Sequence, residues 1–461
     1  MCRLYRWRIV AVPCLVTAFS LVGLATQADE APLVPVTREE MKKVLEQSKK
    51  AKPRLPLPAA DGQDSTNPGN RPVVNNGRMR QLYLPPELRG ADFFRGPDPA
   101  MTLTGTFKTE LFWIVSRANN CIYCLGHQEI KLASSGLSED QIAALDLNWS
   151  QFSPAEQAAF AFTRQITLAP HTVNDDSIAE LKKHFSESQV LEILFTVANN
   201  NATNRWTGGL AIPQEENGSA LLRAVGQGAT LRNFSTFLTP TSEQFAGRPS
   251  KVAPLGSVEP QQQSAPACLP PRPDSPSREE IETALTACRK RPPRLTLVEE
   301  AKARELLPDD WPKGPLPQYV RLLAHFPKAG PARVISLRAA AEKGALSPRL
   351  KAQIAWIAAR EDRAWYALGH AKARLKTLGL DEQEIHTFDK DSTKLSPAER
   401  SAFALVRKLA LSPALVTDSD VAELRTHFKD QEVAELIYHV CNAAFFNRLT
   451  EAAGLQLEDT E

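Results

Sequence analysis

The chain has 461 residues, which exceeds the usual size of one domain, so we expect two folded units. Its 55 basic and 53 acidic residues give a formal net charge of +2, and no block of like charge stands out. This balance gives no electrostatic support for nucleic-acid binding. The 35 prolines are too many for an uninterrupted helical protein and indicate extended linkers.

The N-terminus has the pattern of an export signal. Basic residues at positions 3, 6 and 8 precede an apolar run from Ile9 to Ala25, and the small residue Ala28 then precedes polar residues. We expect residues 1–28 to be removed on export to the periplasm or the medium, which leaves no membrane attachment. An uncleaved membrane anchor is the alternative. Outside the cytoplasm, thiols are oxidised unless something reduces them.

The remaining chain contains two copies of one unit. Ser-Pro-Ala-Glu occurs at 153–156 and 396–399, His-Phe at 184–185 and 427–428, and Asn-Arg at 204–205 and 447–448, always at an offset of 243. Upstream, Arg-Glu-Glu at 38–40 and 278–280 and Pro-Arg-Leu at 53–55 and 293–295 repeat at an offset of 240. Each copy is therefore predicted to have a leading helix, a Pro-rich connector and a helical body.

The sequence predicts helices throughout the helical body of each copy. Thr37 with Glu40 and Ser277 with Glu280 form capping boxes, and apolar residues on one broad face predict a helix over 190–201. Gly136 is placed to end the helix that begins near residue 121. No alternating β-branched run with hairpin turns occurs in the sequence. We therefore predict an all-α fold of two tandem helical domains that form a pseudo-dimer.

The expected organisation has six segments. They are a signal peptide at 1–28, a leading helix and connector at 29–95, a helical domain at 96–232, a disordered Pro-rich linker at 233–276, a second leading helix and connector at 277–345, and a second helical domain at 346–461. The linker assignment depends on the richness in Pro, Ser and Gln between positions 235 and 277.

Two cysteines separated by two residues are the most reactive feature of the sequence. Cys121 and Cys124 follow Asn119-Asn120, a predicted break between two helices, so the second helix would run from Cys121 to about Ser134. A thiol at a helix N-terminus has a stabilised thiolate, so we expect a lowered pKa and the greater exposure at Cys121. With a second thiol one turn away, the pair can cycle between dithiol and disulfide.

Other groups near the cysteines can move protons. His127 lies three residues after Cys124 on the same helix face. Glu110, about three turns before Cys121, becomes a proton acceptor if the two helices pack antiparallel. A structural disulfide and a zinc site remain alternatives, although only three zinc ligands are near. Covalent haem attachment requires a histidine directly after the second cysteine, where Leu125 stands, so that interpretation fails.

The pattern Glu110…Ser116…Asn119-Asn120-Cys121-Ile122-Tyr123-Cys124-Leu125-Gly126-His127, with Asn204-Arg205-Trp206 downstream, resembles the alkylhydroperoxidase D-like or carboxymuconolactone decarboxylase superfamily. The resemblance covers about residues 105–215 and, more weakly, about 348–458. It implies an all-α fold, frequent oligomerisation and reduction of peroxides. It also implies that Cys124 is the peroxidatic thiol, Cys121 the resolving thiol, and Glu110 and His127 the proton relay.

Two positions depart from the family pattern. Gln128 stands where members commonly have a histidine, and Thr109 stands where they have the glutamate. In the second copy, Ala364 and Ala367 replace the cysteines, so that copy is expected only to pack against the first.

The sequence thus predicts an exported thiol peroxidase that acts on a small hydroperoxide with an unknown thiol or disulfide electron donor. We expect no cofactor, no metal, no nucleic acid partner, and a possible homo-oligomer beyond the internal pseudo-dimer. The alternative is a non-enzymatic helical scaffold in which Cys121 and Cys124 form a structural disulfide.

Overall fold

The computed structural model describes residues 34–58, 74–89, 98–215, 236–252, 273–390 and 393–459. Within these ranges the secondary structure is helical and contains no strand, so the all-α prediction is confirmed. The predicted export signal lies outside the described residues. None of the described helices is both long enough and apolar enough to cross a bilayer.

We call the described residues up to 252 the N-terminal half and those from 273 the C-terminal half. The N-terminal half contains α1 (Arg38–Ser48), α2 (Asn75–Tyr83), α3 (Gly105–Ala118), α4 (Ile122–Ser134), α5 (Glu139–Leu147), α6 (Pro154–Leu168), α7 (Asp175–Lys182) and α8 (Glu187–Gly209), with 3₁₀ turns η1 (Pro86–Leu88), η2 (Trp149–Gln151) and η3 (Pro170–Thr172).

The C-terminal half repeats this order. It contains α10 (Arg278–Cys288), α11 (Glu300–Arg304), α12 (Gln318–Leu323), α13 (Ala329–Glu342), α14 (Pro348–Asp362), α15 (Trp365–Thr377), α16 (Glu382–Thr387), α17 (Pro397–Leu411), η5 (Pro413–Leu415), α18 (Asp418–Arg425) and α19 (Asp430–Ala452). The bounds of α4, α6, α7 and α8 recur in α15, α17, α18 and α19, each shifted by 243 residues.

Local sequence explains where many helices begin and end. Ser153 and Ser396 cap their helices by accepting from the backbone N–H of the glutamate three residues later, with proline at the first helical position. Between α3 and α4 the chain reverses through Asn120, whose φ of 49° lies in the left-handed region that asparagine tolerates. Helix α4 ends at Ser134, and Gly136 follows with a φ of 97°.

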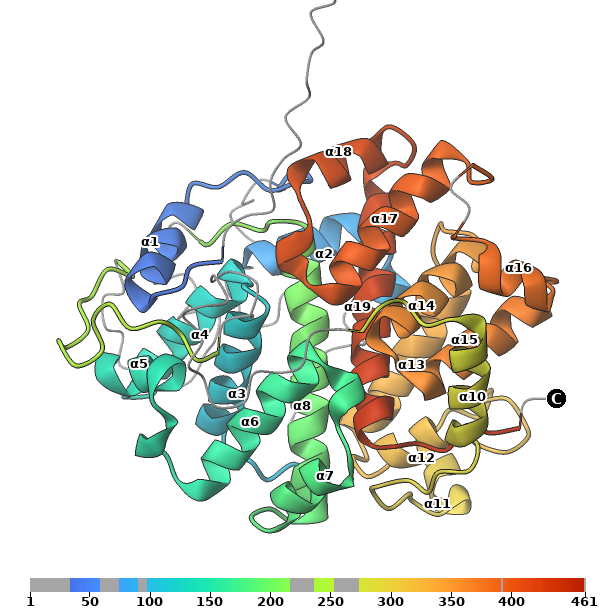
Figure 1. Cartoon of the computed structure of the whole chain (residues 1–461), viewed down its shortest axis with the longest axis horizontal. Coiled ribbons are helices and arrows are strands. Elements are labelled where there is room, and N and C mark those ends of the chain that lie inside the picture. Colours follow the sequence, from blue (N-terminus) through green and yellow to red (C-terminus); the bar gives the residue numbers. More distant parts are fainter. Residues whose placement is uncertain are drawn as a thin grey trace, which may run out of the picture.

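The two longest helices, α8 and α19, lie side by side in the centre of the molecule, with the other helices of each half around them (Figure 1). Most residues of both helices are buried, and polar residues are buried among them. Low amphipathicity is expected of a helix that is covered on all sides.

Buried arginines tie each central helix to the opposite half. Arg205 on α8 donates to the carbonyl of Ala410 at 2.7 Å, and its equivalent Arg448 on α19 donates to the carbonyl of Thr167 at 3.0 Å. Ala410 and Thr167 are themselves equivalent, in the last turns of α17 and α6. Each guanidinium therefore satisfies a terminal carbonyl and complements the negative end of a helix in the opposite half.

A second pair of arginines repeats the reciprocity. Arg54 donates to the carbonyl of Gly208 at 2.8 Å and pairs with Asp418 at 2.8 Å. Its counterpart Arg294 donates to the carbonyl of Glu451 at 2.8 Å and pairs with Asp175 at 2.7 Å. Such self-complementary contacts have the form of an isologous interface.

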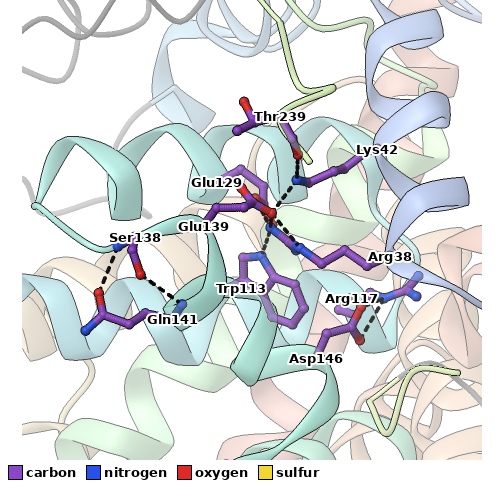
Figure 2. A network of polar contacts seen from close by, with 10 residues as sticks. All are labelled: Arg38, Lys42, Trp113, Arg117, Glu129, Ser138, Glu139, Gln141, Asp146 and Thr239. Atoms are coloured by element: carbon purple, nitrogen blue, oxygen red, sulfur yellow. Dashed lines mark hydrogen bonds and ion pairs between the residues drawn. The ribbon is translucent and has the colours of Figure 1, made fainter. Parts of the chain in front are cut away.

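Each leading helix docks on its own half through ion pairs, and Figure 2 shows those of α1. Arg38 on α1 donates to both carboxylate oxygens of Glu129, at 2.9 and 2.8 Å, and Lys42 pairs with Glu139. At two of the four equivalent places in the C-terminal half the signs reverse, whereas Arg278 and Glu382 keep the signs of Arg38 and Glu139. Lys372 replaces Glu129, and Glu282 on α10 replaces Lys42, with 2.6 Å between Lys372 Nζ and Glu282 Oε1.

Residues 236–252, which fall inside the predicted disordered linker, instead pack on the N-terminal half. Phe245 is buried against Ala143, Ala144 and Leu147 of α5, and Phe237 is also buried. Ser250 donates its backbone N–H to the carbonyl of Val36 at 2.8 Å. The apolar side chains in this polar stretch explain the difference, because they anchor it to the body.

Arg448 also pairs with buried Asp362 at 3.1 Å, whereas the residue equivalent to Asp362 in the N-terminal half is the neutral Asn119. We therefore expect Arg448→Met to lower the free energy of unfolding by about 3 kcal/mol, because a buried carboxylate loses its ion pair. Arg205→Met should lower the free energy of unfolding by clearly less than Arg448→Met does. Urea unfolding of both variants tests this, and adding Asp362→Asn to Arg448→Met should restore part of the loss. Equal losses would contradict the argument.

Candidate active site

Cys121 and Cys124 lie at the start of α4, just after the end of α3. Cys121 is the N-cap residue of α4, as predicted, and Cys124 lies in its first turn. Both thiols are free, and both residues are buried, with 1 % and 3 % of their surface exposed. The prediction that Cys121 is the more exposed thiol is wrong, because the end of α8 covers the start of α4.

One hydroxyl serves both thiols. The Thr207 Oγ1 of α8 lies 3.0 Å from Cys121 Sγ and 3.1 Å from Cys124 Sγ. Thr207 also donates to the carbonyl of Thr203, at 3.0 Å. A hydroxyl has one proton and two lone pairs, so Thr207 can accept a hydrogen bond from a thiol or donate one to a thiolate. When one sulfur becomes a thiolate, rotation of the same hydroxyl supplies a donor to it.

Asn204, one turn before Thr207, is held in a fixed orientation near the thiols. Its Oδ1 accepts from Asn119 Nδ2 at 3.0 Å, which directs its own Nδ2 toward Ser116 Oγ at 3.3 Å and toward Cys124. The amide therefore presents N–H donors, and no charge, to the sulfur. In the C-terminal half the equivalent Asn447 donates to Asp362 instead, at 3.0 Å.

The two thiols differ in acidity in the opposite sense to the one predicted. Burial raises the pKa of Cys121 well above its ordinary value, and the neighbouring Cys124 raises it further. Burial also raises the pKa of Cys124, but hydrogen bonds from Cys121, Thr207 and Asn204 together outweigh it, so this pKa is lowered. The N-cap position of Cys121 thus does not decide its acidity, because burial is the larger effect. Cys124 is the more acidic thiol.

Lys131 lies two turns after Cys124 on α4. Burial lowers the pKa of its ammonium, and the sulfur of Cys124 raises it in part. The positive charge in turn helps to lower the pKa of Cys124. A cation that is poorly solvated and close to a thiolate stabilises it more than a hydrated surface lysine does.

Glu110 is buried in α3, but the structure places it beside α6. Burial and the charge of Glu156 on α6 raise its pKa to about 7. No hydrogen bond or ion pair within the described part of the chain joins Glu110 to either thiol. The carboxyl thus exchanges its proton near neutral pH, without direct contact with the dithiol.

His127 has a carboxylate partner that sequence reasoning missed. His127 Nε2 lies 2.7 Å from Glu215 Oε2, and the Tyr123 hydroxyl donates to Glu215 Oε1 at 2.8 Å. These interactions lower the pKa of Glu215 to about 2 although burial opposes the shift. His370, Tyr366 and Glu458 repeat the arrangement, with 3.0 Å between His370 and Glu458. The offset of 243 relates Glu215 to Glu458 and was the signal available in the sequence.

Gly126 allows the chain after α8 to cross α4 closely. A Cβ atom at this position would lie 2.2 Å from Gln214 Nε2, and the Gln214 amide donates to the carbonyls of Ile122 and Tyr123 at 2.7 and 2.9 Å. Gly369 meets Leu457 in the same way. Glycine therefore occurs at both equivalent positions because a larger side chain would clash with the segment that follows the central helix. In the N-terminal half, Gly126 lets Gln214 and Glu215 approach α4, the helix that carries Cys124.

Among the described residues, the ligand atoms of Glu282, Glu382 and His386 converge within 4.8 Å of one another. Lys372 lies between the two carboxylates, at 2.6 and 3.0 Å. Lys376 also pairs with Glu382, so two ammonium groups offset the two carboxylates, and this cluster forms the ion-pair network that docks α10.

A scan against protein-family models gives no match for this chain, and a search of curated proteins gives none either.

Thr207→Val removes the shared hydroxyl while keeping the shape of the side chain. We expect the pKa of Cys124 to rise, because the thiolate loses one of its donors. The rate of alkylation by iodoacetamide rises with pH as the thiol ionises. In the variant, the midpoint of this rise should lie at a higher pH than in the unchanged protein. Thr450→Val, the equivalent change in the half where alanines replace Cys121 and Cys124, is the control and should leave the profile unchanged.

Glu110→Gln introduces the residue that the C-terminal half has at position 353. The pKa of Glu110 is about 7 in the native state and about 4.5 in the unfolded chain. Between pH 4.5 and pH 7 the native state therefore keeps a proton that the unfolded chain has released. Stability therefore falls as pH rises through this window. The variant should be more stable than the unchanged protein by roughly 3 kcal/mol at pH 8 and equal to it at pH 4, in urea unfolding. A gain of the same size at both pH values would contradict this origin.

Proposed function

We propose that the protein is an exported thiol peroxidase in which Cys124 attacks a hydroperoxide and Cys121 resolves the product. The observation that carries the proposal is a pair of adjacent free thiols that share Thr207. Cys124 has the additional donor Asn204, and hydrogen bonds lower its pKa, whereas burial raises the pKa of Cys121. A nucleophile and a protonated resolving thiol have this relationship.

The reaction balances with these two sulfurs and one external donor. The Cys124 thiolate attacks the distal oxygen of ROOH, the O–O bond breaks, and the leaving alkoxide takes a proton to become ROH. The Cys124 sulfenic acid then reacts with the Cys121 thiol, which forms the S–S bond and releases water. Two electrons and two protons from an external dithiol restore the starting state. Asn204 and Lys131 stabilise the attacking thiolate.

For Glu110 and His127 we propose the role of proton relay. Glu110 has a pKa of about 7, which suits a group that gives and takes protons near neutral pH. His127 is held by Glu215, one turn from Cys124. Because neither group bonds directly to a thiol among the described contacts, the relay requires water or substrate atoms between them.

We also propose that the two halves are tandem alkylhydroperoxidase D-like domains arranged as a pseudo-dimer. Equal helix bounds at an offset of 243 and the reciprocal contacts of Arg205 with Arg448 and of Arg54 with Arg294 support this arrangement. The C-terminal copy retains the His370–Glu458 pair and lacks thiols at positions 364 and 367. The export proposal depends on the signal-like pattern in residues 1–28.

The alternative is a helical scaffold in which Cys121 and Cys124 form a permanent disulfide. The low exposure of both residues favours it, because a structural bond needs no access. In that case the oxidised pair resists mild reductants, and its loss lowers the melting temperature sharply.

Cys124→Ser tests the peroxidase directly. With dithiothreitol as electron donor, the unchanged protein should consume cumene hydroperoxide catalytically, and the variant should lose this activity because serine does not form the sulfenic acid. Cys121→Ser should allow one turnover that leaves a trappable sulfenic acid on Cys124. Cys441→Ala, which alters another buried thiol on α19, is the control and should retain activity. Equal activity in Cys124→Ser would refute the assignment.

A further inference from the structure

The C-terminal half contains a cavity of about 400 Å³ between α13, α14, α15 and α19. Its wall includes Ala367 and Asn447, the positions equivalent to Cys124 and Asn204. The cavity therefore occupies the same place in the C-terminal half that the dithiol occupies in the N-terminal half. Its volume falls in the range of pockets that bind small organic molecules.

Replacement of larger residues by alanine opens this space. Five alanines line the cavity at positions where the N-terminal half has larger side chains: Ala352 for Thr109, Ala355 for Phe112, Ala367 for Cys124, Ala371 for Gln128 and Ala443 for Asn200. Loss of the two thiols explains only one of these five changes at the wall. The other four also remove volume, whereas Phe446 for Thr203 and His439 for Thr196 add it.

The cavity is lined mainly by apolar and aromatic groups. Phe446 and Tyr319 meet edge to face, with ring centroids 5.0 Å apart, and Tyr319 also meets His370. At the rim, the guanidinium of Arg338 lies over the ring of Trp311 at 5.2 Å. These surfaces suit an apolar ligand body.

A few polar groups in the wall are left to bind a ligand. Asn442 is 93 % buried, since only 7 % of it is exposed, and its Nδ2 has no hydrogen-bond partner within the described chain. A buried donor without a partner is costly unless a ligand or water accepts from it. Arg374 lies on the exposed rim and forms no ion pair with another described residue.

The carboxylates around the cavity already have partners within the protein. Glu342 pairs with Arg338 at 2.9 Å, Glu435 pairs with Lys351 at 3.3 Å, and Glu458 lies 3.0 Å from His370 Nε2. The cation at the rim that has no ion pair among the described residues is Arg374, and the unused donor inside is the amide of Asn442. Both favour an acceptor that carries negative charge.

We propose that this cavity is a binding site for an amphipathic organic acid of medium chain length. The apolar body lies among the alanines and the aromatic rings, and the carboxylate receives hydrogen bonds from Asn442 or Arg374. The site is separate from the dithiol and does not depend on the peroxidase activity. The C-terminal half is thus a ligand-binding domain as well as a packing partner.

Isothermal titration calorimetry of decanoate into the full-length protein tests the site. We expect saturable binding of one decanoate per chain, which Cys124→Ser leaves unchanged. Ala355→Phe, which restores the residue of the N-terminal half, should weaken binding at least tenfold by filling the cavity. Arg374→Ala, at an exposed position, should weaken decanoate binding about tenfold and leave 1-decanol binding unchanged, because only the acid has the charge.

Asn199→Leu, at the position equivalent to Asn442 in the N-terminal half, is the matched control for Asn442→Leu. Only Asn442→Leu should weaken decanoate binding. Thermal unfolding shows whether Ala355→Phe is folded. If Ala355→Phe does not fold, the affinity of Arg374→Ala for decanoate tests the site instead. Absence of saturable binding, or equal decanoate affinity in the unchanged protein and in folded Ala355→Phe and Arg374→Ala, would overturn the proposal.

Discussion

The packing of α8 against α19 is the constraint on which the rest of the structure depends. Both helices are covered on nearly all sides, so their polar residues must find partners inside the protein. Arg205 and Arg448 meet this requirement by donating to carbonyls at the ends of helices in the opposite half. The same helices carry Thr207 and Asn204 to the thiols. The contact between the halves and the geometry of the dithiol are therefore set by one pair of helices.

Against this common frame, one difference between the halves lies directly beside the dithiol. Asn119 in one half and Asp362 in the other occupy the same place, and each determines the direction of the neighbouring asparagine amide. A carboxylate beside Cys124 would oppose formation of the thiolate, whereas a neutral amide does not. The difference follows from chemistry, because only one half has a sulfur to stabilise. The scaffold is shared, and the side chains around the site are specialised.

Sequence reasoning predicted the helices, their caps, the break at Asn119-Asn120 and the position of Cys121 at a helix start, because short-range patterns decide these features. It erred on the acidity of Cys121, because acidity depends on what covers the thiol, and the covering residue Thr207 lies 86 positions away. It also missed Glu215, whose partner His127 is 88 positions distant, although the repeat contained the signal. The helical pattern likewise did not show that Glu110 lies beside Glu156. Each of these features depends on packing between residues that are far apart in the sequence, and a short stretch of sequence does not show such packing.

The reversed charges where the leading helices dock have a consequence for folding. When two parts of one chain are alike, an element of one part can dock on the other during folding. If α1 occupied the place of α10, Lys42 would meet Lys372, and in the opposite exchange Glu282 would meet Glu129 and Glu139. Arg278 and Glu382 keep the signs of Arg38 and Glu139, so the discrimination depends on the two exchanged positions. Repulsion between like charges at these positions disfavours both exchanged arrangements.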